Sequence, residues 1–351
     1  MGHTLALRRS HLDHRAAVVA ADRDELVAGL RIVAGGEESR EAVVGTAPTE
    51  PGRGLVWVFS GHGSQWAGMG RELLAGEPAF AAAIDELEPV FLEEIGFSPS
   101  RVLRDGDFPT VDRVQTMIFA VQIGLAAVWR PHGVTPDAVI GHSVGEIAAA
   151  VTAGALTPQD GARLICRRSR LLRRVAGRGA MAMAGLSLEE TVERLAGRAD
   201  VVAAISASPS STVVSGDTAA VEALVEQWQA EGVQMRRVAS DVAFHSPQMD
   251  VLVDELAAAA HDLSPREPVI PMYSTALPDP RTTPSADGAY WAANLRDTVR
   301  LTAAVRAAAE DGHHAFLEVS AHPVVARANS EYGQLDLEAK AGSLGLKGPW
   351  E

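Results

Sequence analysis

The residues best suited to chemistry surround Ser143. They form the pattern Gly-His-Ser-Val-Gly over Gly141–Gly145, directly after the apolar stretch 137–141 and before the helix-like segment 144–153. This G-x-S-x-G arrangement is typical of a nucleophile elbow, in which a sharp strand-to-helix turn exposes the serine hydroxyl. The free N–H groups and positive end of the helix dipole favour negative charge there. The N–H of Val144 would therefore face the oxyanion of a tetrahedral intermediate.

A serine hydroxyl is a weak nucleophile and needs a general base. Among the 11 histidines, His245 follows a predicted small domain, so it could stand at a cleft edge. His142 adjoins Ser143, but adjacent side chains point apart, so we do not expect it to be the base. The remaining histidines considered lie in a predicted turn or in the N-terminal segment: His3, His11, His14, His313 and His314. Spacing by itself leaves the base open.

A Gly-rich loop, Ser60–Gln65, follows the apolar stretch Leu55–Phe59. Its backbone could supply a second oxyanion N–H, that of His62. The loop could equally be an ordinary turn, and it lacks the lysine of a phosphate-binding P-loop.

An amphipathic helix is predicted over Leu164–Leu172, and it contains Arg167 and Arg168. Most of its arginines should be solvated. One guanidinium turned into a cleft would bind a carboxylate through two parallel hydrogen bonds.

Strands that alternate with helices predict an α/β fold with a parallel sheet covered on both faces. Predicted strands lie at 55–59, 137–141, 269–274 and 315–319, and predicted helices at 76–94, 113–130 and 144–153. Gly154 could end the last of these helices.

A second pattern fills residues 179–239. Strands at 180–183, 201–206, 212–215 and 233–238 and helices from Ser187 and from Asp217 give the order β-α-β-β-α-β of a ferredoxin-like unit. We interpret it as an insertion in the large domain, which would comprise residues 55–178 and 240–331. A cleft between two such domains is a common ligand site.

The ends of the sequence differ from this body. Residues 1–35 are Ala-rich and helix-like, as in Ala16–Ala34, and a Pro/Gly segment at 46–54 resembles a linker. We therefore assign 1–54 to a linker region and the irregular 332–351 to a trailing linker.

Composition limits the possible classes of protein. The chain has 351 residues, 47% of them apolar and 22% charged, as expected of a soluble globular enzyme. Its formal charge of −14 disfavours nucleic acid as a partner. The single cysteine, Cys166, fits a structural thiol in a reducing cytoplasm. The apolar run Met117–Trp129 is too short to span a bilayer, the N-terminus lacks a signal-peptide core, and no metal-ligand spacing is present. We expect a cytoplasmic enzyme without a membrane anchor or metal.

Four segments in order resemble one family closely: Val58–Gly70, Gly141–Glu146, Arg167–Ser169 and Ala243–Pro247. The resemblance, over about residues 55–330, is to the malonyl-CoA:carrier-protein acyltransferases of modular and iterative type I polyketide synthases. It implies an α/β-hydrolase-like large domain, with residues 1–54 as the linker that follows a ketosynthase. It also implies that the chain is part of a larger synthase, that no cofactor is tightly bound, and that an acyl carrier protein with its phosphopantetheine thiol is the acceptor.

The resemblance also implies roles for single residues. Ser143 matches the acylated serine, and His245 matches its base, which a backbone carbonyl within Asn294–Arg300 would orient. Arg168 matches the residue that pairs with the free carboxylate of malonyl-type substrates. The other implied substrate or oxyanion positions are His62, usually Gln in this family, Val144, Gln65, Gln122, Phe244 and His142.

Two positions bear on the acyl group. In this family Phe before the base, here Phe244, accompanies malonyl, and so does Val144 after the nucleophile. The tetrad Val-Ala-Phe-His matches the malonyl type in three of four places. One methyl group is worth only about 1–3 kcal/mol, so selectivity should be partial. The residues around these motifs, Ser-Gly-His-Gly-Ser and Ser-Asp-Val-Ala-Phe-His, most resemble those of iterative synthases of the methylsalicylic or orsellinic acid type.

Two other classes of protein share part of this pattern. A serine esterase or thioesterase of the α/β-hydrolase kind has the same elbow, although a ferredoxin-like unit here fills the interval where its acidic triad residue would lie. A non-catalytic docking scaffold could retain the fold, but Ser143, His245 and Arg168 are all present.

Overall fold

The computed structural model describes residues 8, 10, 12–37, 39, 42–46 and 54–325. The chain divides into two compact units, one that includes residues 1–52 and one that spans 53–337. The predicted trailing linker at 332–351 lies outside the described residues, as does most of the linker at 46–54.

In the described part of the first unit, a helix of 13 residues lies against a two-stranded antiparallel ribbon. β1 (His14–Val18) pairs with β2 (Ala42–Thr46), and α2 (Arg23–Gly35) packs on both. Asp22 caps α2 by accepting hydrogen bonds from two backbone N–H groups of the first turn. The prediction of a helix over Ala16–Ala34 was therefore wrong at its start, because strand pairing overrides the helix propensity of alanine before the capping residue.

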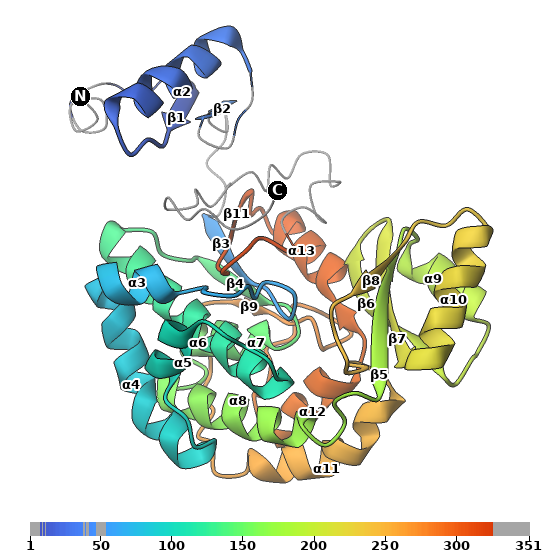
Figure 1. Cartoon of the computed structure of the whole chain (residues 1–351). Helices are drawn as coiled ribbons and strands as arrows, with labels where there is room; N and C mark the ends of the chain where they lie inside the picture. The colour runs from blue at the N-terminus through green and yellow to red at the C-terminus, as the bar shows by residue number, and fades with distance from the viewer. Residues whose placement is uncertain are drawn as a thin grey trace. The chain divides into compact units, whose positions relative to one another are not determined.

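The second unit is built on a parallel sheet of order β11-β3-β4-β9 (Figure 1). Its strands are β3 (Leu55–Phe59), β4 (Ala138–Gly141), β9 (Met272–Tyr273) and β11 (Ala315–Glu318). This confirms the predicted α/β fold with a parallel sheet. All five residues of β3 except the first are buried, which explains its continuous apolar sequence.

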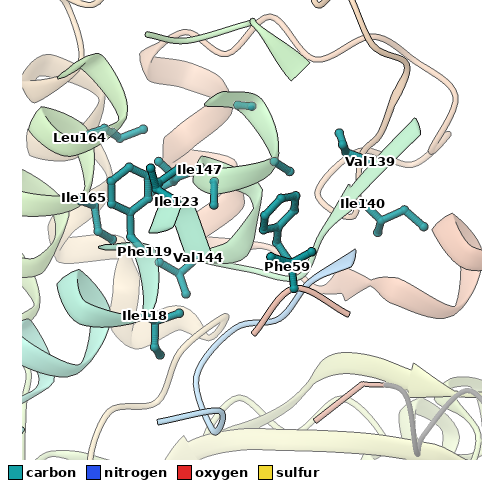
Figure 2. Close-up of a cluster of buried hydrophobic side chains, with 14 of the residues drawn as sticks. Phe59, Ile118, Phe119, Ile123, Val139, Ile140, Val144, Ile147, Leu164 and Ile165 are labelled. Carbon is teal, nitrogen blue, oxygen red and sulfur yellow. The ribbon is translucent and has the colours of Figure 1, made fainter. Parts of the chain in front are cut away.

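Helices cover this sheet. α7 (Gly145–Ala153) packs on β3 and β4 and ends at Gly154, whose φ of 82° suits glycine. α6 (Val111–Trp129) packs against α7, α4 (Pro78–Glu94) and α8 (Pro158–Leu172). Figure 2 shows part of their shared core, in which Phe119 of α6 lies beside Ile165 of α8 and near Val144, with Phe59 of the sheet facing them. The other helices of this layer are α3 (Arg71–Gly76), α5 (Pro99–Asp105) and the 3-10 turn η1 (Arg130–His132).

Within the described residues, Val111–His132 is the one helical stretch long and apolar enough to cross a bilayer. It is 78% buried within the protein, as a core helix of a globular unit would be.

A second sheet has the order β10-β6-β7-β5-β8 (Figure 1). Four of its strands form an antiparallel set: β5 (Gly179–Ala184), β6 (Val201–Ser208), β7 (Ser211–Asp217) and β8 (Met235–Val238). α9 (Leu188–Leu195) and α10 (Thr218–Ala230) connect them, and Ser187 and Glu190 form a capping box at the predicted start of α9. Asp217 precedes α10, but its side chain makes no cap and instead accepts a hydrogen bond from Gln248.

The chain then returns to the main sheet through η2 (Pro247–Met249), α11 (Asp250–Ala259), α12 (Gly288–Arg296) and α13 (Leu301–Glu310). The strand β10 (Val299–Arg300) was not predicted. It pairs in parallel with β6, so residues assigned to the large domain extend the second sheet.

Candidate active site

The elbow at Ser143 has the local geometry that its sequence predicts. Ser143 lies two residues after the end of β4 and has a φ of 56°, a left-handed conformation that costs energy for a non-glycine residue. A side chain at Gly141 would overlap the backbone of Glu146, and one at Gly145 would overlap the carbonyl oxygen of Phe59. Both glycines are therefore needed for the turn to lie this close to its neighbours.

The structure brings Ser143 and His245 together. Ser143 Oγ lies 2.7 Å from His245 Nε2, and His245 Nδ1 lies 3.0 Å from the carbonyl oxygen of Asp297. A carbonyl can only accept, so Nδ1 holds the proton and Nε2 accepts from the serine hydroxyl. The Asp297 carbonyl lies within the range 294–300 in which an orienting carbonyl was expected. The side chains of Ser143 and His245 are both largely buried.

The surroundings of His245 keep its ring neutral. Burial, the positive charge of Arg168 and the nearby His142 together lower the pKa of His245 to about 3, and burial is the largest of these causes. A neutral imidazole with a free acceptor can take a proton from the serine hydroxyl at neutral pH.

Arg167 and Arg168 point in different directions. The Arg167 guanidinium pairs with Glu94 of α4 and Asp262 after α11, so it joins helices at the surface. Arg168 is 1% exposed, and its Nη1 donates to Asn294 Oδ1 at 2.7 Å. Its Nε and Nη2 are buried and have no hydrogen-bond partner among the described residues. Burial lowers the pKa of Arg168 to about 10, which leaves it charged at neutral pH.

A buried carboxylate stands beneath the elbow. Glu146, in the first turn of α7, accepts hydrogen bonds from the Thr275 N–H and the Tyr290 hydroxyl. It accepts a third from Asn294 Nδ2 at 2.8 Å. Burial raises the pKa of Glu146, while these hydrogen bonds oppose the shift. Asn294 Nδ2 also lies 3.1 Å from the carbonyl oxygen of Ser143.

His62 connects the Gly-rich loop to the chain just after β8 of the second sheet. Its Nε2 donates to the Ala239 carbonyl at 3.0 Å, and its ring centroid lies 5.7 Å from that of Phe244. Burial lowers the pKa of His62, which favours a neutral ring. Phe244 is 3% exposed and also packs near His245.

The other predicted site residues differ in placement. Gln122 is buried and donates from Nε2 to the Ser60 carbonyl at 2.6 Å, and its Oε1 has no partner among the described residues. Gln65 accepts from the Gly63 N–H within its own loop. His142 is buried, and burial lowers its pKa to about 4. The N–H groups of Val144 and His62 make no hydrogen bond within the described part of the chain.

Sequence reasoning missed four groups that shape the site. Glu146 lies inside the quoted motif, but nothing local indicates that its side chain is buried. Tyr290 and Asn294 share one face of α12 through their spacing of four residues, and Thr275 follows β9. Only this spacing on α12 was visible in advance. No group of three or more His, Cys, Asp or Glu that could hold a metal occurs among the residues described.

Comparison with known proteins defines the class. Residues 56–345 match the model of the acyl transferase domain family. In structure, the chain is similar to the acyltransferase domain of module 8 of the salinomycin polyketide synthase, with a TM-score of 0.86 and 37% identity over 93% of this chain and 79% of that one. It is also similar to the acyltransferase domain of the polyketide synthase PpsC of Mycobacterium tuberculosis, with a TM-score of 0.76 and 42% identity over 86% and 92%. The chain belongs to the acyltransferase domains of polyketide synthases, which confirms the resemblance seen in its motifs.

Curated relatives are whole synthases. The chain is 54% identical to 5-methyl-1-naphthoate synthase of Streptomyces sahachiroi over 94% of its own length and 19% of the relative's. It is 48% identical to 6-methylsalicylic acid synthase of Penicillium patulum over 93% and 18%. It therefore spans less than a fifth of the curated relatives that it matches.

Proposed function

We propose that this domain transfers a malonyl extender unit from coenzyme A, through an acyl-Ser143 intermediate, to the phosphopantetheine thiol of an acyl carrier protein in polyketide biosynthesis. The observation that supports this most directly is a serine–histidine pair next to a buried arginine with free donors. Ser143 Oγ and His245 Nε2 are 2.7 Å apart, and Arg168 presents two unpaired N–H groups in the same buried network.

The first half-reaction forms the acyl-enzyme. His245 Nε2 takes the hydroxyl proton as Ser143 Oγ attacks the thioester carbonyl, and the N–H groups of Val144 and His62 stabilise the oxyanion. When the tetrahedral intermediate collapses, the C–S bond breaks and His245 returns the proton to the coenzyme A thiolate. In the second half-reaction His245 accepts the proton of the carrier thiol, whose sulfur attacks the acyl ester and releases Ser143 with its proton restored.

The free Nε and Nη2 form one edge of the Arg168 guanidinium, and such an edge binds a carboxylate through two parallel hydrogen bonds. This assigns the malonyl carboxylate to Arg168. Phe244, buried against His62 and His245, would limit the space for an α-methyl group. His142, Gln65 and Gln122 remain proposed as lining residues.

Further parts of the proposal concern the whole molecule. The strand order β8-β5-β7-β6 with α9 and α10 supports a ferredoxin-like insertion at 179–239, beside an α/β-hydrolase-like domain at 55–178 and 240–331. Residues 1–54 are proposed as a ketosynthase-to-acyltransferase linker, and the enzyme as cytoplasmic. Relatives named for naphthoate and methylsalicylic acid support an aromatic-acid synthase as its setting.

Intact-protein mass spectrometry tests the function. The protein is mixed with malonyl-, methylmalonyl- or acetyl-CoA, with Ser143→Ala as the control. We expect a dominant malonyl adduct that is absent from the variant and lost when a phosphopantetheinylated carrier protein is added.

Other outcomes would contradict this proposal. Equal rates with methylmalonyl-CoA would remove the selectivity. Free malonate without a transferable adduct would favour a serine hydrolase, and neither adduct nor turnover would favour a docking scaffold.

A further inference from the structure

The α12 helix supplies three groups to the site. The Tyr290 hydroxyl and the Asn294 amide both donate to Glu146, and the carbonyl of Asp297, the residue that caps the helix, accepts from His245. One helix therefore holds both the base His245 and the Glu146 carboxylate beneath the elbow.

The Asn294 amide makes three hydrogen bonds, two through its nitrogen and one through its oxygen. Nδ2 donates to the Ser143 carbonyl at 3.1 Å and to Glu146 at 2.8 Å, while Oδ1 accepts from Arg168 Nη1 at 2.7 Å. The Ser143 carbonyl can only accept, so it fixes which side of the amide holds the nitrogen. The oxygen must then face Arg168.

This contact determines which edge of the guanidinium stays free. Asn294 occupies Nη1, and the unpaired Nε and Nη2 form the opposite edge. Because the same amide holds the backbone of Ser143, the position of that edge is tied to the nucleophile. Glu146 also attracts the buried charge of Arg168.

We propose that Asn294 is a positioning residue for acyl-group selection: held by Glu146, it fixes the Arg168 carboxylate fork relative to Ser143. This inference rests on the proposed malonyl transfer. It predicts that loss of Asn294 slows acylation by substrates with a free carboxylate, because Arg168 is then misplaced, and has little effect on acylation by substrates without one.

The test compares acylation of Ser143 by malonyl-CoA and acetyl-CoA in four proteins: wild type, Asn294→Ala, Arg168→Ala and the double variant. Loss of a hydrogen bond to a charged group should lower malonyl kcat/KM about ten- to hundredfold in Asn294→Ala, with an acetyl loss several times smaller. If Asn294 acts through Arg168, the double variant should use malonyl-CoA about as well as Arg168→Ala alone.

Tyr290→Phe is the matched control. It removes another hydrogen bond to Glu146 from the same helix without touching Arg168, so it should leave the malonyl-to-acetyl ratio near the wild-type value. Thermal unfolding of each variant shows whether it is folded.

The outcomes separate the two proposals. Equal losses with both substrates in Asn294→Ala, or additive losses in the double variant, would overturn the positioning role while malonyl transfer stands. If wild type shows no preference for malonyl, or Arg168→Ala loses both substrates equally, the carboxylate role of Arg168 fails and this inference fails with it.

Discussion

Ser143 and His245 both have positive φ values, 56° and 58°, which non-glycine residues rarely adopt. Each conformation costs free energy, and the packing around it must compensate. Among the described residues Ala196 and Ala286 also have positive φ, but Ser143 and His245 are the pair whose side chains meet at 2.7 Å. Strain of this kind is common where geometry serves a reaction instead of stability.

At the same scale, Arg168 should control the protonation of His245. Burial is the largest cause of the low pKa of His245, about 3, and the positive charge of Arg168 lowers it as well, so removing that charge in Arg168→Leu should raise the pKa. The pH below which His245 is protonated and acylation of Ser143 falls would then be higher. An NMR titration of the His245 ring measures this directly.

Arg167→Leu is the control for that titration. It removes an adjacent arginine that pairs with Glu94 and Asp262 away from the site, so His245 should titrate as in wild type. A His245 pKa that stays the same or falls in Arg168→Leu would contradict the assignment.

At the scale of elements, the strand–turn–helix from β4 into α7 depends on close backbone approach. Gly145 begins α7 directly against the carbonyl of Phe59 at the end of β3. The contact places the N-terminus of α7, with Ser143 before it, beside the Gly-rich loop that follows β3. The position of the nucleophile is therefore a property of two neighbouring strands.

Gly145→Ala should push the elbow away from β3. Overpacking of this kind costs about 1–3 kcal/mol of stability, and Ser143 acylation should fall along with it. Urea unfolding and acyl-adduct formation measure the two effects.

Gly76→Ala serves as the comparison, because a methyl group at Gly76 meets no atom within 4 Å. It should leave stability and acylation near wild type. Wild-type behaviour of Gly145→Ala would show that the elbow can relax without consequence.

At the scale of the whole molecule, the second unit buries several histidines in neutral form. Burial lowers the pKa values of His142 and His245 to about 4 and about 3, from 6.5. Below pH 6.5 the unfolded chain therefore binds protons that the folded chain does not. Stability should be full above this pH and fall as the pH decreases toward the folded values. Glu146, whose pKa is raised above 4.5, opposes the trend while the pH falls through that raised pKa toward 4.5, because there the folded chain binds a proton that the unfolded chain does not.

Each of these histidines should lower the free energy of unfolding by about 1.4 kcal/mol per pH unit below 6.5. His142→Asn should remove one such contribution, so its stability should depend less steeply on pH between 6.5 and 5. Urea unfolding followed by fluorescence of the buried Trp57 and Trp291 measures the slope. An unchanged slope in the variant would show that His142 is protonated in the folded chain.

The sequence by itself determined the parts of this protein that depend on local chemistry. The Gly-x-Ser-x-Gly elbow, the apolar strands predicted at 55–59 and 137–141 and the helix start at Ser187 follow from neighbouring residues, and each is present to within one residue. The family followed from four motifs in order.

The tertiary structure decided the rest, because it depends on contacts between distant segments. Only packing shows that Arg168 points inward while Arg167 pairs with Glu94, since both lie on one amphipathic helix. Asn294 contacts Ser143 across 151 positions of sequence. The start of the Ala-rich segment forms β1 because it pairs with β2, which lies outside that segment. Local propensity contains no information about such partners, so the groups that orient the nucleophile, the base and the arginine appear only in the folded chain.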